Sequence, residues 1–110
     1  MTNYFKVYLK SNKGTQRYIF KKKEEVITFV NKANKLDYYS YLIIKRLKQG
    51  TDVTIDRGTF DKTKDKIFIK NLDKDWRVVD NMVVDWNKYK KHKEERWYLL
   101  CQKNLMFIKY

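Results

Sequence analysis

The sequence predicts a small α+β domain in which one early helix packs on an antiparallel, hairpin-rich sheet. Two patterns favour this class: strict alternation of apolar and polar residues near the N-terminus, and helical spacing of apolar residues over residues 24–34. Helical and strand patterns do not alternate along the chain, which argues against a doubly wound parallel sheet. We expect a single domain over residues 1–110, since one core usually serves a chain of this length.

Residues 4–20 are predicted to form a β-hairpin. Phe5, Val7 and Leu9 alternate with polar or amphipathic residues, so one face of the first strand is apolar. A turn follows, in which Gly14 can adopt a positive φ. The chain then returns as the second strand of the hairpin.

Residues 24–34 are predicted to form an α-helix. Val26, Phe29, Val30 and Ala33 are spaced at i, i+3, i+4 and i+7 and therefore share one face. Acidic residues stand at the start of this segment and basic residues at its end, which complements the helix dipole. We expect this helix to cover the apolar face of the sheet.

Residues 37–48 allow two interpretations. Tyr41 and Ile43 alternate with other residues as in a strand, but the segment could also form a helix that ends before Gly50. We favour a strand, because residues 51–55 have the pattern of a partner strand after a short turn.

The remaining segments are predicted as turns, loops and short strands. A turn is expected at residues 57–58, followed by a polar loop. The charged residues 89–96 would form an excursion, although a helix over residues 88–102 is the competing interpretation. The predicted strands are 67–72 and 76–79, joined through a turn at 73–75, then 82–86, and a closing hairpin of 97–102 with 105–110.

Composition indicates a folded protein that carries a large positive charge. The chain holds 26 Lys and Arg against 13 Asp and Glu, a formal net charge of +13 on 110 residues. Hydrophobic residues make up 43% and aromatic residues 16% of the chain, which argues against disorder. Folding brings these positive side chains together, so they repel one another, and binding to a polyanion relieves the repulsion. Nucleic acid is therefore the predicted class of partner.

Several classes of protein and site are disfavoured. No apolar run approaches the roughly 18 residues of a membrane span, so no membrane partner is expected. Cys101 is the only cysteine, which excludes an internal disulfide and fits the reducing cytoplasm of a bacterial cell. One Cys and one His cannot form a zinc site within a monomer, and no cofactor or metal is expected. The proline-free, lysine-rich composition is typical of AT-rich genomes, including those of phages and mobile elements. The oligomeric state is left open.

Three basic clusters form the predicted binding surface. Residues 1–50 hold 12 Lys and Arg against 3 Asp and Glu, whereas residues 51–85 hold 7 against 8, so the excess is uneven. If the fold brings the clusters together, they form a strip that binds phosphates, and tyrosines beside them could stack unpaired bases. The alternative is a solvated lysine coat. The predicted binding residues are Lys21, Lys22, Lys23, Lys45, Arg46, Lys48, Lys88, Tyr89, Lys90, Lys91, Lys93 and Arg96.

These features favour a small non-enzymatic module that binds RNA or single-stranded DNA backbone, since lysine suits phosphate neutralisation better than base reading. A second hypothesis is a phage or mobile-element inhibitor that binds an acidic surface or the guide-RNA complex of a host defence nuclease, as anti-CRISPR proteins do. A third is a metal-free ribonuclease toxin that uses His92, Lys91, Arg96 and Tyr98. No pair of residues has the spacing of a catalytic acid and base, so no catalytic residue is predicted.

Overall fold

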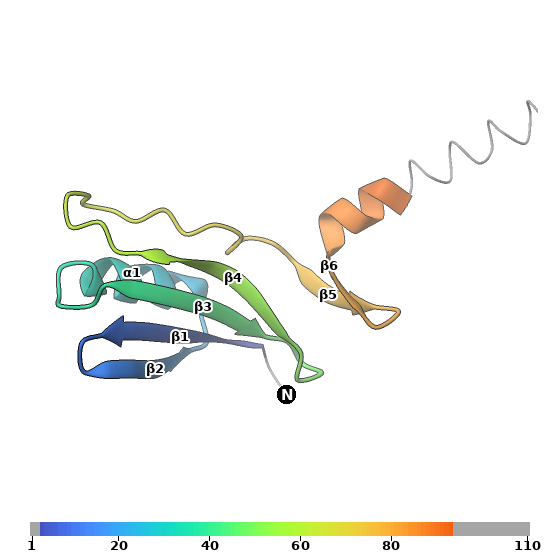
Figure 1. Cartoon of the computed structure of the whole chain (residues 1–110). Helices are drawn as coiled ribbons and strands as arrows, with labels where there is room; N and C mark the ends of the chain where they lie inside the picture. The colour runs from blue at the N-terminus through green and yellow to red at the C-terminus, as the bar shows by residue number, and fades with distance from the viewer. Residues whose placement is uncertain (1–2, 94–110) are drawn as a thin grey trace, which may run out of the picture. The chain divides into compact units, whose positions relative to one another are not determined.

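The structure is a computed structural model that describes residues 3–93 (Figure 1). It confirms the predicted α+β class. The chain consists of two compact units, Met1–Asp73 and Lys74–Tyr110, which are described separately below. In chain order the elements are β1 (Tyr4–Ser11), β2 (Gly14–Phe20), α1 (Lys23–Ala33), β3 (Ser40–Arg46), β4 (Asp52–Thr59), β5 (Trp76–Val79) and β6 (Met82–Asp85).

The first unit contains a four-stranded antiparallel sheet in the order β2-β1-β3-β4. The predicted hairpin over residues 4–20 is confirmed, with Gly14 at a φ of 116° where the chain turns into β2. Strand β3 pairs with the other edge of β1, which confirms the strand interpretation of residues 37–48 over Ser40–Arg46. Gly50, at a φ of 83°, lies in the turn that leads from β3 to β4.

Helix α1 covers one face of this sheet and contacts β1 and β2, as expected from its apolar stripe (Figure 1). The ring of Phe29 packs against β2, with its centroid 4.7 Å from that of Tyr18 and 4.8 Å from that of Phe20. The helix, the sheet and the segments that follow β3 and β4 together contribute to an apolar core. Its residues are Phe5, Val7, Leu9, Val26, Val30, Ala33, Tyr41, Ile43, Leu47, Val53, Ile55, Ile69 and Leu72.

Strand β4 continues through residues 57–58, so the predicted turn at this position is wrong. Arg57 pairs with Leu42 and Gly58 with Tyr41, and these ladder contacts keep the backbone extended. The register between β3 and β4 shifts between Ile43 and Ile44. Such a β-bulge changes the alternation of side chains along the longer strand.

The predicted strand at residues 67–72 is also wrong, because this segment is irregular. Ile69 and Leu72 are buried, but their spacing of three residues does not match the period of two that a strand needs. A helix side chain holds the segment instead: Asn31 Oδ1 accepts a hydrogen bond from the Ile67 backbone N–H at 2.7 Å.

The second unit contains a hairpin of β5 and β6. The predicted strands at 76–79 and 82–86 are confirmed nearly to the residue, and they pair with each other. Asp80 and Asn81 connect them at φ values of 51° and 65°, as a tight two-residue hairpin turn requires.

A helical segment follows directly, over residues 86–93. The prediction of a charged excursion at 89–96 is therefore wrong over residues 89–93. These residues are helical, as the competing interpretation of residues 88–102 expects. The predicted strands at 97–102 and 105–110 lie outside the described residues. Among residues 3–93, no helix is long and apolar enough to cross a membrane.

Candidate functional site

The face of the sheet turned away from α1 is the candidate functional site. Side chains alternate along a strand, so the residues of β1 that stay out of the core project from this face. The strand register then defines which residues of the other strands share it. We call this surface the open face; it comprises Tyr4, Lys6, Tyr8, Lys10, Thr15, Arg17, Ile19, Ser40, Leu42, Ile44, Arg46, Asp52, Thr54, Arg57 and Thr59.

One row of side chains crosses all four strands in the middle of the open face, and we call it the central row. Arg17 of β2 lies opposite Tyr8 of β1, Tyr8 opposite Leu42 of β3, and Leu42 opposite Arg57 of β4. Because neighbouring strands lie about 4.8 Å apart, the two arginines start roughly 15 Å from each other. Both arginines are exposed, whereas Tyr8 and Leu42 between them are half-buried.

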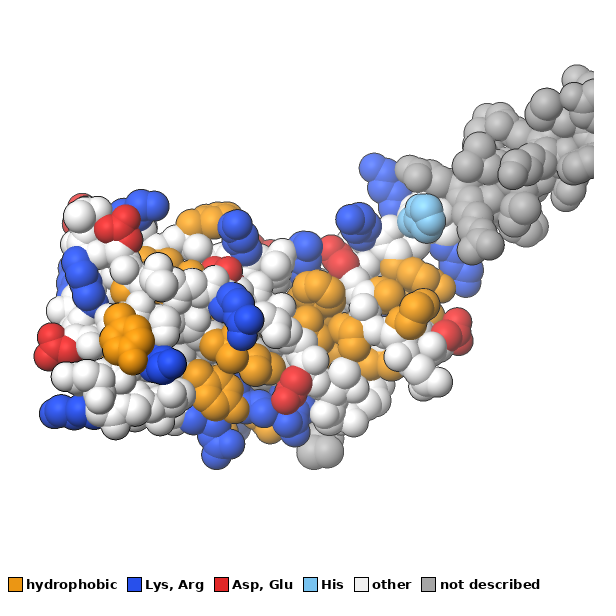
Figure 2. Space-filling model, viewed as in Figure 1, with side chains coloured by type: hydrophobic (Ala, Val, Ile, Leu, Met, Phe, Trp, Pro, Cys, Tyr) orange, Lys and Arg blue, Asp and Glu red, His pale blue; other side chains and the backbone are white. Residues whose placement is uncertain are grey.

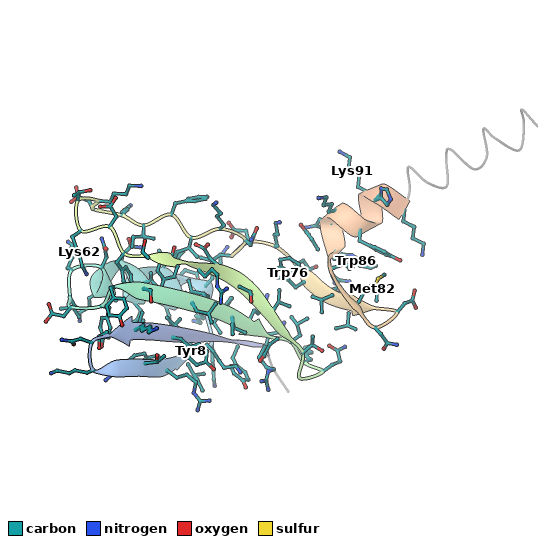
Figure 3. The ribbon with its side chains drawn as sticks, viewed as in Figure 1. Tyr8, Lys62, Trp76, Met82, Trp86 and Lys91 are labelled. Carbon is teal, nitrogen blue, oxygen red and sulfur yellow. The ribbon has the colours of Figure 1, made fainter. Side chains whose placement is uncertain are left out.

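An open hollow of about 400 Å³ lies along this row. Tyr8, Leu42 and Arg57 line it together with Lys10, Thr15 and Ser40 from the adjacent row. Figure 3 labels Tyr8 and views the sheet from this side, with α1 behind it. The hollow thus combines an aromatic ring, an aliphatic floor, cations and hydroxyl groups.

Positive charge predominates on the open face. It carries one carboxylate, that of Asp52, and five cationic side chains. In the space-filling view, Lys and Arg side chains lie among hydrophobic ones over the sheet (Figure 2). Two of the five bind this carboxylate: Lys6 Nζ lies 3.2 Å and Arg46 Nη2 3.0 Å from Asp52 Oδ2. Arg46, and then Lys6, lower the pKa of Asp52 to about 2, so its charge persists at neutral pH.

The other three cations of the open face are Lys10, Arg17 and Arg57. Over residues 3–93, none of them has a carboxylate within 4 Å of its charged group. All three are exposed. They are therefore available to an anionic ligand, unlike Lys6 and Arg46.

In the predicted lysine cluster at residues 21–23, Lys21 and Lys22 connect β2 to α1, and Lys23 is the first residue of α1. Lys21 and Lys22 are exposed, while Lys23 forms an ion pair with Asp73. The hydrogen bond from Lys23 to Asp73 raises the pKa of the lysine. Part of this cluster is therefore neutralised within the first unit.

The strand geometry separates the predicted cluster of Lys45, Arg46 and Lys48. Lys45 lies on the α1 side, with Nζ 5.5 Å from the centre of the Phe5 ring, whereas Arg46 lies on the open face. Lys48 is exposed in the turn before β4. A period of two thus places sequence neighbours on opposite faces.

The third predicted cluster belongs to the second unit. Lys88, Lys90, Lys91 and Lys93 are exposed on the helical segment, and Arg96 lies outside the described residues. Its joining with the other clusters into one strip stays a prediction. The residues of the ribonuclease hypothesis divide in the same way, since His92 and Lys91 are exposed on this segment and Arg96 and Tyr98 are not described.

Tyr89 of this cluster packs within the second unit. Its ring stacks on that of Trp86 at a centroid distance of 6.0 Å, and the Arg77 guanidinium lies 4.5 Å from the centre of the Trp86 ring (Trp86 is labelled in Figure 3). Tyr89 is half-buried as a result. Its ring already has a stacking partner.

Sequence reasoning missed Tyr8, Arg17 and Arg57. The alternation in β1 was a usable signal, because it places Tyr8 on the polar face of a strand. No comparable signal pointed to the arginines, whose position beside Tyr8 depends on strand order and register. Cross-strand neighbours of this kind come only from the tertiary structure.

Within the described part of the chain, no three His, Cys, Asp or Glu side chains are placed to hold a metal ion. No protein-family model matches the chain, and neither a curated protein nor a solved structure matches it. The geometry of the open face is therefore the basis for assigning a function.

Proposed function

We propose that this protein is a small non-enzymatic module that binds the phosphate backbone of nucleic acid on its open face. The observation that carries the proposal is the central row, in which exposed Arg17 and Arg57 stand at the two ends and, among residues 3–93, neither guanidinium group has a carboxylate within 4 Å. In a duplex, each strand presents one phosphate for about every 3.4 Å of helix axis. A separation of roughly 15 Å therefore corresponds to a few consecutive nucleotides.

The distribution of arginine supports this proposal. Arginine accounts for only 5 of the 26 basic residues, yet Arg17, Arg46 and Arg57 all project from the open face. A genome bias toward lysine would not concentrate arginine on one surface. The guanidinium group binds phosphate through two parallel hydrogen bonds, which lysine cannot form.

The proposal is tested by the salt dependence of binding to a labelled oligonucleotide. A double variant, Arg17→Gln with Arg57→Gln, is compared with a matched control, Lys21→Gln with Lys22→Gln, which removes the same charge outside the open face. Each lost phosphate contact makes the log–log slope about 0.7 shallower for a single strand. We expect the log–log slope of the arginine variant to be about 1.4 shallower than that of the wild type. The lysine control should keep most of the wild-type slope.

Two outcomes would contradict the proposal. If the lysine control lost as much affinity as the arginine variant, binding would depend on net charge and not on the open face. If capture from a cell lysate yielded a partner that survives nuclease digestion while oligonucleotides fail to bind, the protein would be an inhibitor that docks on an acidic protein surface.

A further inference from the structure

We infer that the open face takes unpaired nucleotides, with the ring of Tyr8 stacking on one base while Arg17 and Arg57 hold the phosphates on either side. This inference rests on the proposed function and adds the ligand class, which is single-stranded nucleic acid. Bases in a duplex are stacked on each other and cannot present a face to a tyrosine ring.

The bonding of Tyr8 differs from that of the other described tyrosines. The hydroxyl groups of Tyr18, Tyr38, Tyr39 and Tyr41 each donate a hydrogen bond within the protein. The remaining two have ring partners, since Tyr4 lies under the Arg46 guanidinium at 6.0 Å and Tyr89 stacks on Trp86. Over residues 3–93, Tyr8 has neither a hydroxyl hydrogen bond nor a ring or cation partner.

The surroundings of Tyr8 match the parts of a nucleotide. Leu42 extends the apolar surface beside the ring, so a base can lie over both side chains. The hydroxyl groups of Thr15 and Ser40 line the same hollow and can bond the polar edge of a base or a sugar. The hollow, at about 400 Å³, falls in the size range of small-ligand sites.

The cations are placed for the backbone on either side of that base. Arg17 and Arg57 stand in the same row as Tyr8, one on each edge strand of the sheet, and Lys10 lines the hollow from the adjacent row. A strand that crosses the sheet along this row meets a cation, a ring and a second cation in that order. Surfaces that bind single strands usually combine cations that follow the backbone with aromatic rings that stack on bases.

The test uses three probes of equal length, about ten nucleotides, within the usual site size for such surfaces. They are oligothymidine, the same backbone without bases, and a short duplex. The wild-type chain is compared with Tyr8→Leu, which removes the ring, and Tyr8→Phe, which keeps the ring and removes only the hydroxyl. Thermal unfolding of both variants confirms that they are folded.

We expect Tyr8→Leu to weaken binding of oligothymidine by about 5- to 150-fold, the effect of one lost stacking contact, without a change in salt slope. Tyr8→Phe should bind as the wild type does. The base-free backbone should bind the wild type about as weakly as oligothymidine binds Tyr8→Leu. A 2-aminopurine placed in the oligonucleotide should be quenched by the wild type and by Tyr8→Phe, but not by Tyr8→Leu.

The failure of this inference is distinguishable from the failure of the proposed function. If the base-free backbone or the duplex bound as tightly as oligothymidine, with the expected arginine dependence, only the stacking role of Tyr8 would be wrong. If Tyr8→Leu bound like the wild type, the same conclusion would follow. If no probe bound at low salt, both proposals would be overturned together.

Discussion

Lys6 and Asp52 form an ion pair on the open face, with Nζ of Lys6 3.2 Å from Oδ2 of Asp52, although Lys6 is only 7% exposed. Lys6 lies between Ile19 and Ile44 in the strand register, so its aliphatic stem is covered by its neighbours. Arg46 binds the same carboxylate. These cations stabilise the sheet, and the remaining cations of the open face are left for a ligand.

Replacing Asp52 with Asn is expected to destabilise the protein. The change leaves the buried ammonium group of Lys6 without an anionic partner, which costs about 1–3 kcal/mol for a group of this burial. The free energy of unfolding in urea measures the effect. The control is Asp73→Asn, which breaks the exposed pair with Lys23 and should change stability much less than Asp52→Asn. Equal effects of the two substitutions would contradict this interpretation.

The same carboxylate predicts a loss of stability in acid. Arg46 and Lys6 lower the pKa of Asp52 from 3.8 to about 2 in the folded protein. The unfolded chain therefore binds a proton more readily, so the stabilisation is complete above about pH 4 and is lost as the pH falls toward 2. A carbon-13 NMR titration of the Asp52 carboxyl measures its pKa directly. A midpoint near 4, or an equal acid response in Asp52→Asn, would contradict the prediction.

Tyr41 predicts a loss of stability in alkali. Burial of its side chain, followed by its hydrogen bond to Asp56 at 3.0 Å, raises the pKa of Tyr41 to about 12 from 10.0. The folded state holds the proton more tightly, so this contribution is complete below about pH 10 and is lost as the pH rises toward 12. Phenolate absorbance of the wild type and of Tyr41→Phe, followed with pH, isolates this group. If the difference in phenolate absorbance between the two proteins appeared near pH 10 while both stayed folded, burial would not raise the pKa of Tyr41 as stated.

Gly58→Ala is expected to destabilise the sheet. A Cβ at this position would lie 3.2 Å from the Tyr41 hydroxyl oxygen and 3.4 Å from Cζ. Since Asp56 and the Phe60 ring hold Tyr41 in place, the contact cannot relax freely, and we expect a cost of about 1–3 kcal/mol. Thr59→Ala, at an exposed position of the same strand, serves as the control in thermal unfolding. A neutral Gly58→Ala would show that the Tyr41 ring moves aside easily.

Asn34→Ala is expected to loosen the segment that follows β4. Asn34 is only 2% exposed, and its Nδ2 donates to the backbone oxygens of Asp61 at 2.9 Å and Lys64 at 3.0 Å. Removal of the amide leaves the Lys64 carbonyl without this donor and leaves the Asp61 carbonyl only its bond from the Lys64 backbone N–H at 3.2 Å, so the attachment of the segment to the helix weakens. Trypsin should then cleave at the lysines of residues 61–66 faster than in the wild type, whereas Asn12→Ala, in an exposed turn, should not alter the rate. Unchanged cleavage in Asn34→Ala would mean that other contacts hold the segment.

The periodicity of the sequence was sufficient where burial alone shapes an element. The alternation over residues 4–20 and the helical spacing over 24–34 both predicted the observed elements, because each pattern reports directly which side chains face the core. It was insufficient over residues 67–72. There Ile69 and Leu72 are buried although their own segment is irregular. Asn31, which lies far from this segment in the sequence, helps to hold it in place through a hydrogen bond.

The sequence by itself determined the fold class, the excess of positive charge and the two faces of β1. Only the tertiary structure decided which charges become neighbours. Arg17 and Arg57 meet Tyr8 in one row because the apolar face of every strand must pack toward the core, and this requirement selects the register. For the same reason Lys45 and Arg46, adjacent in the chain, lie on opposite faces of the sheet.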